Sequence, residues 1–121
     1  MRRELAAGVL AFCALAGSGK AAAQNYGAIA YSPSTKHYGW SYDYPSRAAA
    51  ESAASANCRK QASDCIVPLW FRNACGALAI GSGGYGTAWA TDRSGAERQA
   101  LVVCRRYTMD CAVTRWVCTT R

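Results

Sequence analysis

The chain has 121 residues, 51% of them hydrophobic, and its 14 lysines and arginines against seven acidic residues give a formal net charge of +7. That length suits one small domain rather than several. The seven cysteines contain no C-x-x-C spacing, and the single histidine is His37, which argues against a zinc site.

Residues 1–23 have the parts of a secretory signal peptide. A basic start is followed by Leu5–Ala16, an apolar stretch too short to span a membrane, and then by small residues that end at Ala23. We therefore expect an exported protein, periplasmic or secreted, with no transmembrane segment after cleavage. The expected domain comprises residues 24–121, which keep eleven basic and six acidic residues.

The rest of the chain is an internal repeat. Residues 46–70 align with residues 92–116 without a gap, and ten of the 25 positions are identical. Upstream, "GAIA" at 27–30 corresponds to "GALA" at 76–79. The sequence therefore predicts two copies, about 26–74 and 75–121, that are each too short to bury much alone and share one core.

Each copy predicts the order strand, strand, helix, strand, and hence an α+β domain of two tandem ββαβ units with antiparallel sheet. Ser46 and Asp92 are the expected helix N-caps, although Ser94 with Glu97 would also fit a capping box slightly later. Pro68 predicts an edge strand or a bulge for its segment. The expected strands are 27–31, 38–44, 65–71, 76–80, 85–91 and 111–118, and the expected helices run from 46 to about 60 and from 92 to about 106.

Helix and strand composition adds two expectations. Alanines lie on one stripe of each helix, which predicts a close approach of helix to sheet. Trp70 and Trp116 occupy equivalent positions in the last strands and are expected in the core.

Six cysteines remain after export, an even number that predicts a disulfide framework in a small secreted chain. Equal spacing and equivalent positions favour one set of three bridges. Pairing of equivalent cysteines across the two copies is the alternative. The favoured bridges are Cys58–Cys65, Cys104–Cys111 and Cys75–Cys118.

Gly81, Gly83 and Gly86 form a literal G-x-G-x-x-G, the pattern of a dinucleotide-binding loop. Such a loop needs a helix directly after the glycines, whereas residues 85–91 predict a strand. The aligned segment of the first copy, 31–39, keeps only Gly39. We therefore expect a hairpin whose glycines supply positive φ angles, and we expect neither a nucleotide nor another cofactor.

The chain resembles a known family of exported bacterial proteins. The segments "YGAIAYSPST", "YGWSYDYPSRAAAE", "WFRNACGALAIG", "GYGTAW" and the closing "WVC" resemble the domain of unknown function 4189 (DUF4189). The resemblance covers about Tyr26 to Cys118. It implies export, cysteine pairing and a single domain, and it implies no reaction and no catalytic residue.

Three sets of residues are candidates for an interaction site. Arg72 and Asn73 lie at the junction between the copies, without an aligned counterpart in the second copy. Trp40 and Tyr42 belong to an aromatic strand that could stack on a partner, although packing within the sheet also explains them. Arg105 and Arg106 lie at a helix end, where they favour the helix dipole, and they could form a cationic face together with Arg98, Arg115 and Arg121.

The leading hypothesis is a non-enzymatic, monomeric binding protein that contacts an anionic envelope component or a partner protein. Export and the lack of a recognised module argue against a specific nucleic-acid ligand. The alternative is a small envelope hydrolase that uses Asp or Glu acid–base chemistry, with Asp43 beside the aromatic strand as the candidate acid. The other acidic residues mostly repeat between the copies, which suits structural roles, and a catalytic constellation is not expected.

Overall fold

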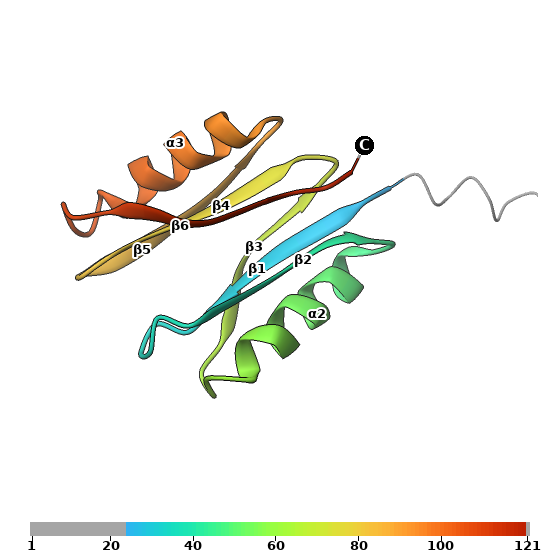
Figure 1. Ribbon diagram of the computed structural model, residues 1–121, viewed down its shortest axis with the longest axis horizontal. Coiled ribbons are helices and arrows are strands. Elements are labelled where there is room, and N and C mark those ends of the chain that lie inside the picture. Colours follow the sequence, from blue (N-terminus) through green and yellow to red (C-terminus); the bar gives the residue numbers. More distant parts are fainter. Residues whose placement is uncertain (1–23, 121) are drawn as a thin grey trace, which may run out of the picture.

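The computed structural model describes residues 24–120, so the predicted signal peptide, residues 1–23, lies outside the described residues. The described chain forms two three-stranded antiparallel sheets and two helices. Figure 1 shows four layers, in which the two sheets pack against each other and one helix covers the outer face of each sheet. In chain order the elements are β1 (Tyr26–Tyr31), β2 (Tyr38–Tyr44), α2 (Arg47–Arg59), β3 (Ile66–Arg72), β4 (Cys75–Gly81), β5 (Gly84–Ala90), α3 (Arg93–Cys104) and β6 (Ala112–Cys118).

The same arrangement occurs twice. The strand orders are β2-β1-β3 and β5-β4-β6, so the first strand of each unit is central in its sheet. This confirms the predicted α+β fold with ββαβ repeated in tandem. Pro68 lies in an outer strand, β3, beside a shift in the register between β1 and β3. An outer strand with an irregularity is where a residue without a backbone N–H is tolerated.

The central strands alternate between two buried environments. On β1, Ala28 and Ala30 pack against α2, whereas Ile29 and Tyr31 face the other sheet. On β4, Leu78 faces the other sheet in the same way. The two sheets therefore share one buried cluster, formed by Ile29, Tyr31, Leu69, Phe71, Ala74, Leu78 and Val117.

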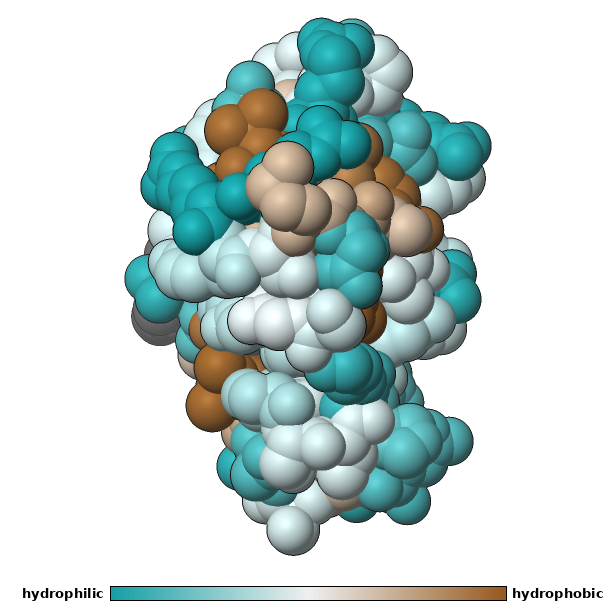
Figure 2. Space-filling model, turned by 90° about the vertical axis from the view of Figure 1, so that its left-hand side faces the viewer, coloured by the Kyte–Doolittle hydropathy of each residue, from teal (hydrophilic) through white to brown (hydrophobic). Residues whose placement is uncertain are grey.

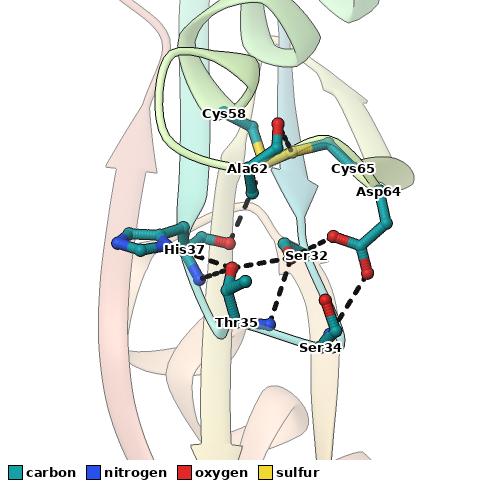
Figure 3. Close-up of a disulfide and its surroundings, with 8 residues drawn as sticks. All are labelled: Ser32, Ser34, Thr35, His37, Cys58, Ala62, Asp64 and Cys65. Carbon is teal, nitrogen blue, oxygen red and sulfur yellow. Dashed lines mark hydrogen bonds between the residues drawn. A yellow bond between two sulfur atoms is a disulfide. The ribbon is translucent and has the colours of Figure 1, made fainter.

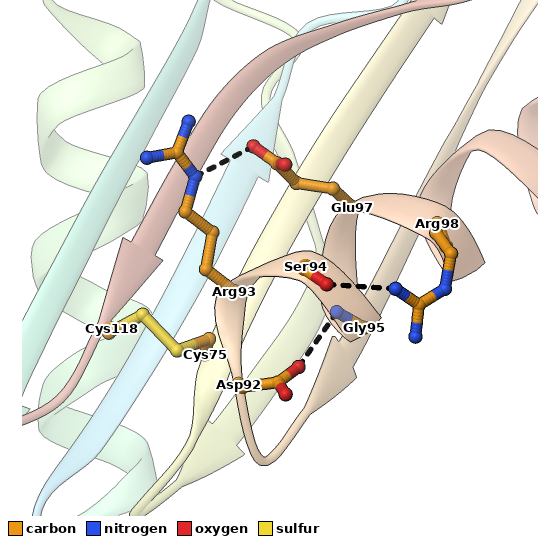
Figure 4. Close-up of polar contacts among 8 residues, drawn as sticks. All are labelled: Cys75, Asp92, Arg93, Ser94, Gly95, Glu97, Arg98 and Cys118. Carbon is orange, nitrogen blue, oxygen red and sulfur yellow. Dashed lines mark hydrogen bonds and ion pairs between the residues drawn. A yellow bond between two sulfur atoms is a disulfide. The ribbon is translucent and has the colours of Figure 1, made fainter.

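Both helices begin at the predicted caps. The side chain of Ser46 accepts a hydrogen bond from the N–H three residues later at 3.1 Å. Asp92 does the same for Gly95 at 2.8 Å (Figure 4). The alternative start at Ser94 does not occur: α3 begins at Arg93 with Asp92 as its N-cap, and the Ser94 hydroxyl accepts a hydrogen bond from Arg98.

Gly39 and Gly86 occupy equivalent places where a strand passes beneath its helix. A Cβ atom at Gly39 would lie 2.4 Å from the backbone nitrogen of Cys58, and one at Gly86 would lie 2.3 Å from that of Cys104. Alanines on the facing helix stripes are fully buried, as predicted. The helices therefore approach the sheets closely enough to exclude any side chain at these two positions.

The glycine run has a different cause from the one predicted. None of the described glycines has a positive φ, so the expectation that they supply positive φ angles in the turn is wrong. A Cβ at Gly81 would lie 2.4 Å from Thr108, and one at Gly84 would lie 2.6 Å from Tyr107. At these two positions of the hairpin between β4 and β5, the loop after α3 therefore leaves no room for a side chain.

Three disulfides are present, and they are the favoured set. Cys58–Cys65 and Cys104–Cys111 each join a helix end to the segment before the next strand. Cys75 and Cys118 lie directly opposite each other on β4 and β6. Three bridges in so small a protein are typical of exported chains.

Trp70 and Trp116 are not core residues, contrary to prediction, because each is 39% exposed. The Arg47 guanidinium lies 4.6 Å from the ring centroid of Trp70, and that of Arg93 lies 4.0 Å from Trp116. Each arginine also pairs with a glutamate one turn later, and Figure 4 shows the pair with Glu97. Each tryptophan ring is therefore covered by an arginine of the neighbouring helix and is not buried in the core.

The surface at the hairpin end of the molecule is mixed in character. Figure 2 shows this end, where hydrophobic residues form separate small patches among hydrophilic ones. Neither helix of residues 24–120 is long and apolar enough to cross a bilayer.

Candidate functional site

The two sheets differ at the positions that flank the central residues Ile29 and Leu78. In the first sheet, Ile29 pairs with Trp40 on one side and Leu69 on the other. In the second sheet, Leu78 occupies the equivalent place and pairs with Thr87 and Arg115. Trp40 thus corresponds to Thr87, and Leu69 corresponds to Arg115.

The sheets pack so that β2 lies near β6, and β3 lies near β5. The β2/β6 side, here called the closed side, receives both large residues. The guanidinium of Arg115 lies 4.0 Å from the ring centroid of Trp40 and 5.8 Å from that of Tyr38. The Nε atom of Arg115 is buried without a hydrogen-bond partner, so the stack shields it from solvent.

A second contact seals the closed side near its end. Asp43 has a positive φ of 62° within a register shift between β1 and β2. Its carboxylate accepts hydrogen bonds from the backbone N–H of Thr120 at 2.8 Å and from the hydroxyl of the same residue at 2.6 Å. The segment after β6 is thereby fastened across β2.

The β3/β5 side, here called the open side, receives the two smaller residues, Leu69 and Thr87. Two pockets of about 450 and 270 Å³ lie along it, and both include Pro68 in their linings. We call them together the groove. The first pocket is lined by Pro68, Leu69, Trp70, Phe71, Arg72 and Trp89, and the second by Pro68, Gly83, Gly84, Tyr85, Gly86, Thr87, Val103 and Tyr107.

The groove is lined by the edges of two strands and by aromatic side chains. Five consecutive residues of β3 line the first pocket, and four residues of β5, with the preceding glycine, line the second. Trp89 is 56% exposed and Tyr107 is 66% exposed. Arg72 is the one charged residue in either lining, and no carboxylate is among them.

The structure separates Arg72 from Asn73, which the sequence placed in one candidate site. Arg72 lines the groove. Asn73 has a φ of 48°, and its side chain accepts a hydrogen bond from the N–H of Asn25 at 3.1 Å, so its contacts are structural. The two residues also have counterparts in the second unit, contrary to prediction. Arg72 corresponds to Cys118, because Arg72 pairs with Tyr26 in the first sheet as Cys118 pairs with Cys75 in the second. Asn73 corresponds to Thr119, because each forms hydrogen bonds with the residue just before the first strand of its unit, Asn25 or Ala74.

The predicted aromatic stripe on β2 is divided by the irregularity at Asp43. Tyr38 and Trp40 pack against the cluster between the sheets. Tyr42 is 49% exposed, on the closed side. Trp40 is therefore a packing residue, and Tyr42 alone of the two candidates is available at the surface.

The predicted cationic face is incomplete. Arg105 and Arg106 are exposed at the end of α3, as expected. Arg115 instead lies in the stack with Trp40, and Arg98 bonds Ser94 at the start of the helix. Arg121 lies outside the described residues.

All six acidic side chains of residues 24–120 have polar contacts with their surroundings. Asp43 is held by Thr120, Asp92 caps α3, and the two glutamates pair with arginines. The remaining pair fixes the hairpins. Asp64 accepts hydrogen bonds from the hydroxyl of Ser32 and the N–H of Ser34, and Asp110 accepts them from Ser82 and Thr108.

Hydrogen bonds from these hydroxyl and N–H groups stabilise the charged carboxylates and lower both pKa values. The pKa of Asp64 is lowered chiefly by the hydroxyl of Ser32, and that of Asp110 falls to about 2, chiefly because of Thr108 and Ser82. Acids with such low pKa values are poor proton donors at neutral pH.

The cluster around Asp64 contains a serine, a threonine and the histidine, so it deserves comparison with a catalytic triad. His37 Nδ1 lies 3.0 Å from the Thr35 hydroxyl, which lies 2.7 Å from the Ser32 hydroxyl (Figure 3). Asp64 contacts Ser32 rather than the histidine, so it does not orient the imidazole as a triad requires. Ser32 is fully buried, which also hides the oxygen nearest to the carboxylate.

No group of three or more His, Cys, Asp or Glu side chains within residues 24–120 could hold a metal ion. All six cysteines in this part of the chain are in disulfides. The geometry provides no support for Asp43 as a catalytic acid, because its carboxylate is bonded to Thr120.

The sequence reasoning missed Trp89, Tyr107 and the open side as a whole. A signal was present in the repeat, because Trp40 aligns with Thr87 two residues before Trp89. This difference between the copies indicates an open side only when it is known which outer strands face each other, and the alignment of the copies does not contain that information.

Three mycobacterial proteins with systematic names are similar to this chain. A segment of 64 residues is 50% identical to "Protein Rv1269c" and "Protein MT1307" of Mycobacterium tuberculosis and to "Protein Mb1300c" of Mycobacterium bovis. The match covers 53% of this chain and 48% of each relative, so the chain matches about half the length of these curated relatives. No solved structure matches it. Residues 26–118 match the family described as "Domain of unknown function (DUF4189)", and the chain therefore belongs to that family.

Proposed function

We propose that this protein is an exported, non-enzymatic binding protein and that the groove on the open side is its ligand site. The observation that carries the proposal is the difference between two otherwise equivalent sides of a duplicated fold. Trp40 and Arg115 fill the closed side, whereas Thr87 and Leu69 leave space on the open side. Exposed aromatic residues beside that space are typical of binding surfaces.

Export is supported by the three disulfides and by the expected signal peptide. Because the disulfides and the close helix contacts hold both walls of the groove, the protein would lose little conformational freedom on binding. Envelope components and partner proteins are the ligands within reach of an exported protein.

The experiment is a titration of the isotope-labelled protein, followed by NMR, with soluble peptidoglycan fragments, anionic phospholipid vesicles and acidic peptides as separate probes. The proposal expects at least one probe to shift the indole resonance of Trp89. The variant Trp89→Ala should weaken that binding, whereas Tyr42→Ala, which removes an exposed aromatic from the closed side, should leave it unchanged.

A second variant fills the groove with the pair that already packs on the closed side. Thr87→Trp combined with Leu69→Arg should fold and should abolish binding. Shifts that map to Tyr42 or to Arg105 and Arg106, and that persist in this filled variant, would contradict the proposed site.

A further inference from the structure

The four outer strands of the two sheets are protected to different degrees. An unprotected outer strand presents unpaired N–H and C=O groups to other chains, so proteins usually interrupt it with a bulge, a proline or charged residues. The pairings of β2, β3 and β6 each contain a register shift. β3 also carries Pro68, and β6 carries Arg115.

β5 has none of these protections. Its seven residues, Gly84–Ala90, pair with β4 without a register shift, and the segment contains no proline and no charged residue. Its outer edge borders the groove. A regular, uncharged outer strand beside a preformed groove is the arrangement into which an extended peptide can add as a further strand.

The side chains around this edge favour a peptide over a sugar chain. Trp70 already stacks on Tyr26 at 6.1 Å and carries the guanidinium of Arg47, so its ring faces are occupied. Trp89 has no such ring contact among the described residues and provides one broad apolar surface. One free ring suits a single anchoring side chain of a peptide, and backbone pairing along β5 would supply the remaining contacts.

The charge of the groove favours an acidic peptide. Arg72 lines the groove without a carboxylate partner, and it is the charged residue of the two linings. In residues 24–120, the acidic side chains are engaged in contacts within the protein, and only Arg47 and Arg93 form ion pairs. An acidic partner would therefore meet attraction at the Arg72 end of the groove and no repulsion from its lining.

We infer that the groove receives an extended acidic segment of a partner protein, which pairs as an added strand with the outer edge of β5 and places an apolar side chain against Trp89. This inference rests on the proposed function and names the class of partner. The segment would be about as long as β5, and its alternate side chains would point toward the groove.

The test uses an eight-residue peptide of alternating glutamate and valine, with blocked ends, as the probe. Hydrogen exchange followed by NMR should show slower exchange of outward-facing amides of β5, by roughly tenfold or more at saturation, and no change in β2. The same peptide with alternate backbone nitrogens methylated cannot complete the ladder and should not bind. A lysine–valine peptide should bind at least about tenfold more weakly, and Arg72→Glu should reduce that difference.

Three results would overturn the inference, and they separate it from the proposed function. Binding of an anionic oligosaccharide at Trp89 without binding of the peptide would keep the groove as the site and reject the strand. Concentration-dependent dimers that pair through β5, detected by sedimentation and lost in the filled variant, would make a second copy the occupant. Peptide binding that the filled variant leaves intact would reject the groove and the proposed function together.

Discussion

Thr120 donates two hydrogen bonds to the carboxylate of Asp43, a residue that lies 77 positions earlier in the chain. The contact ties the segment after β6 to the irregular part of β2. Aspartate also suits the backbone at this position, whose φ is 62°, because it tolerates this conformation better than most residues with a side chain. The acid that the sequence nominated for catalysis is thus committed to a structural contact.

The hydroxyl half of this contact can be removed alone. We expect Thr120→Val to keep the backbone bond and to lower the free energy of unfolding by about 1 kcal/mol, because one charged acceptor loses a donor. Urea denaturation followed by tryptophan fluorescence measures the change. Thr114→Val is the matched control, since that hydroxyl bonds only to a carbonyl two residues away at 3.3 Å. Equal effects of the two substitutions would contradict the structural role of the contact.

The glycines of the β4–β5 region should differ sharply in their tolerance of alanine. Gly86→Ala places a methyl group 2.3 Å from the backbone nitrogen of Cys104 and 2.5 Å from the carbonyl oxygen of Ala100, so we expect a loss of about 3 kcal/mol or more. At Gly83 the nearest atom, in Thr108, lies 3.3 Å from the added methyl group. Gly83→Ala should therefore change the thermal midpoint little. Comparable loss at both positions would show that local conformation, rather than contact with α3, selects these glycines.

The stability of the protein should fall in acid partly through Asp110. Its pKa is about 2 in the folded protein against 3.8 for the ordinary group, so the unfolded chain binds the proton more readily. The stabilisation is complete above about pH 4 and is lost as the pH falls toward 2. Asp64 acts in the same direction. Thermal midpoints measured from pH 6 to pH 2 should therefore drop less steeply for Asp110→Asn than for the native chain, and the two curves should run parallel above pH 5.

The three disulfides should contribute unequally. Cys75–Cys118 closes a separation of 43 residues, whereas Cys58–Cys65 closes one of seven. Loop-closure entropy predicts contributions of about 4 and about 2.5 kcal/mol, respectively. Denaturation of the Cys75→Ala/Cys118→Ala and Cys58→Ala/Cys65→Ala double variants measures both. The opposite ranking would mean that contacts in the folded protein outweigh the restriction of the unfolded chain.

Much of the fold could be predicted because its sequence pattern occurs in both copies of the repeat. The helix caps, the alanine stripes and the equally spaced cysteines occur at equivalent positions, so each copy supports the interpretation of the other. Trp70 and Trp116 show the limit of this reasoning. Their equivalence was correct, but repetition cannot distinguish a buried ring from one covered by an arginine of the neighbouring helix.

The candidate site was predicted less well because it depends on where the copies differ. Arg72, one of the nominated residues, lines the groove, although the stated reason for nominating it, its lack of a counterpart, was wrong. Trp40 was nominated because it belongs to an aromatic strand that could stack on a partner, yet it fills the closed side beneath Arg115. Only the packing of β3 against β5 shows that Thr87 and Leu69 occupy the matching space, and this contact joins segments that no periodicity relates.

The cluster between the sheets has a consequence for how the chain unfolds. Ile29 and Phe71 from one unit and Leu78 and Val117 from the other are buried together, so separating the units exposes the inner faces of both sheets at once. Neither unit then retains enough buried apolar surface to persist alone, even with the disulfides within each unit intact. Despite the duplication, calorimetric and van't Hoff enthalpies should agree, as they do when a protein melts in one cooperative step.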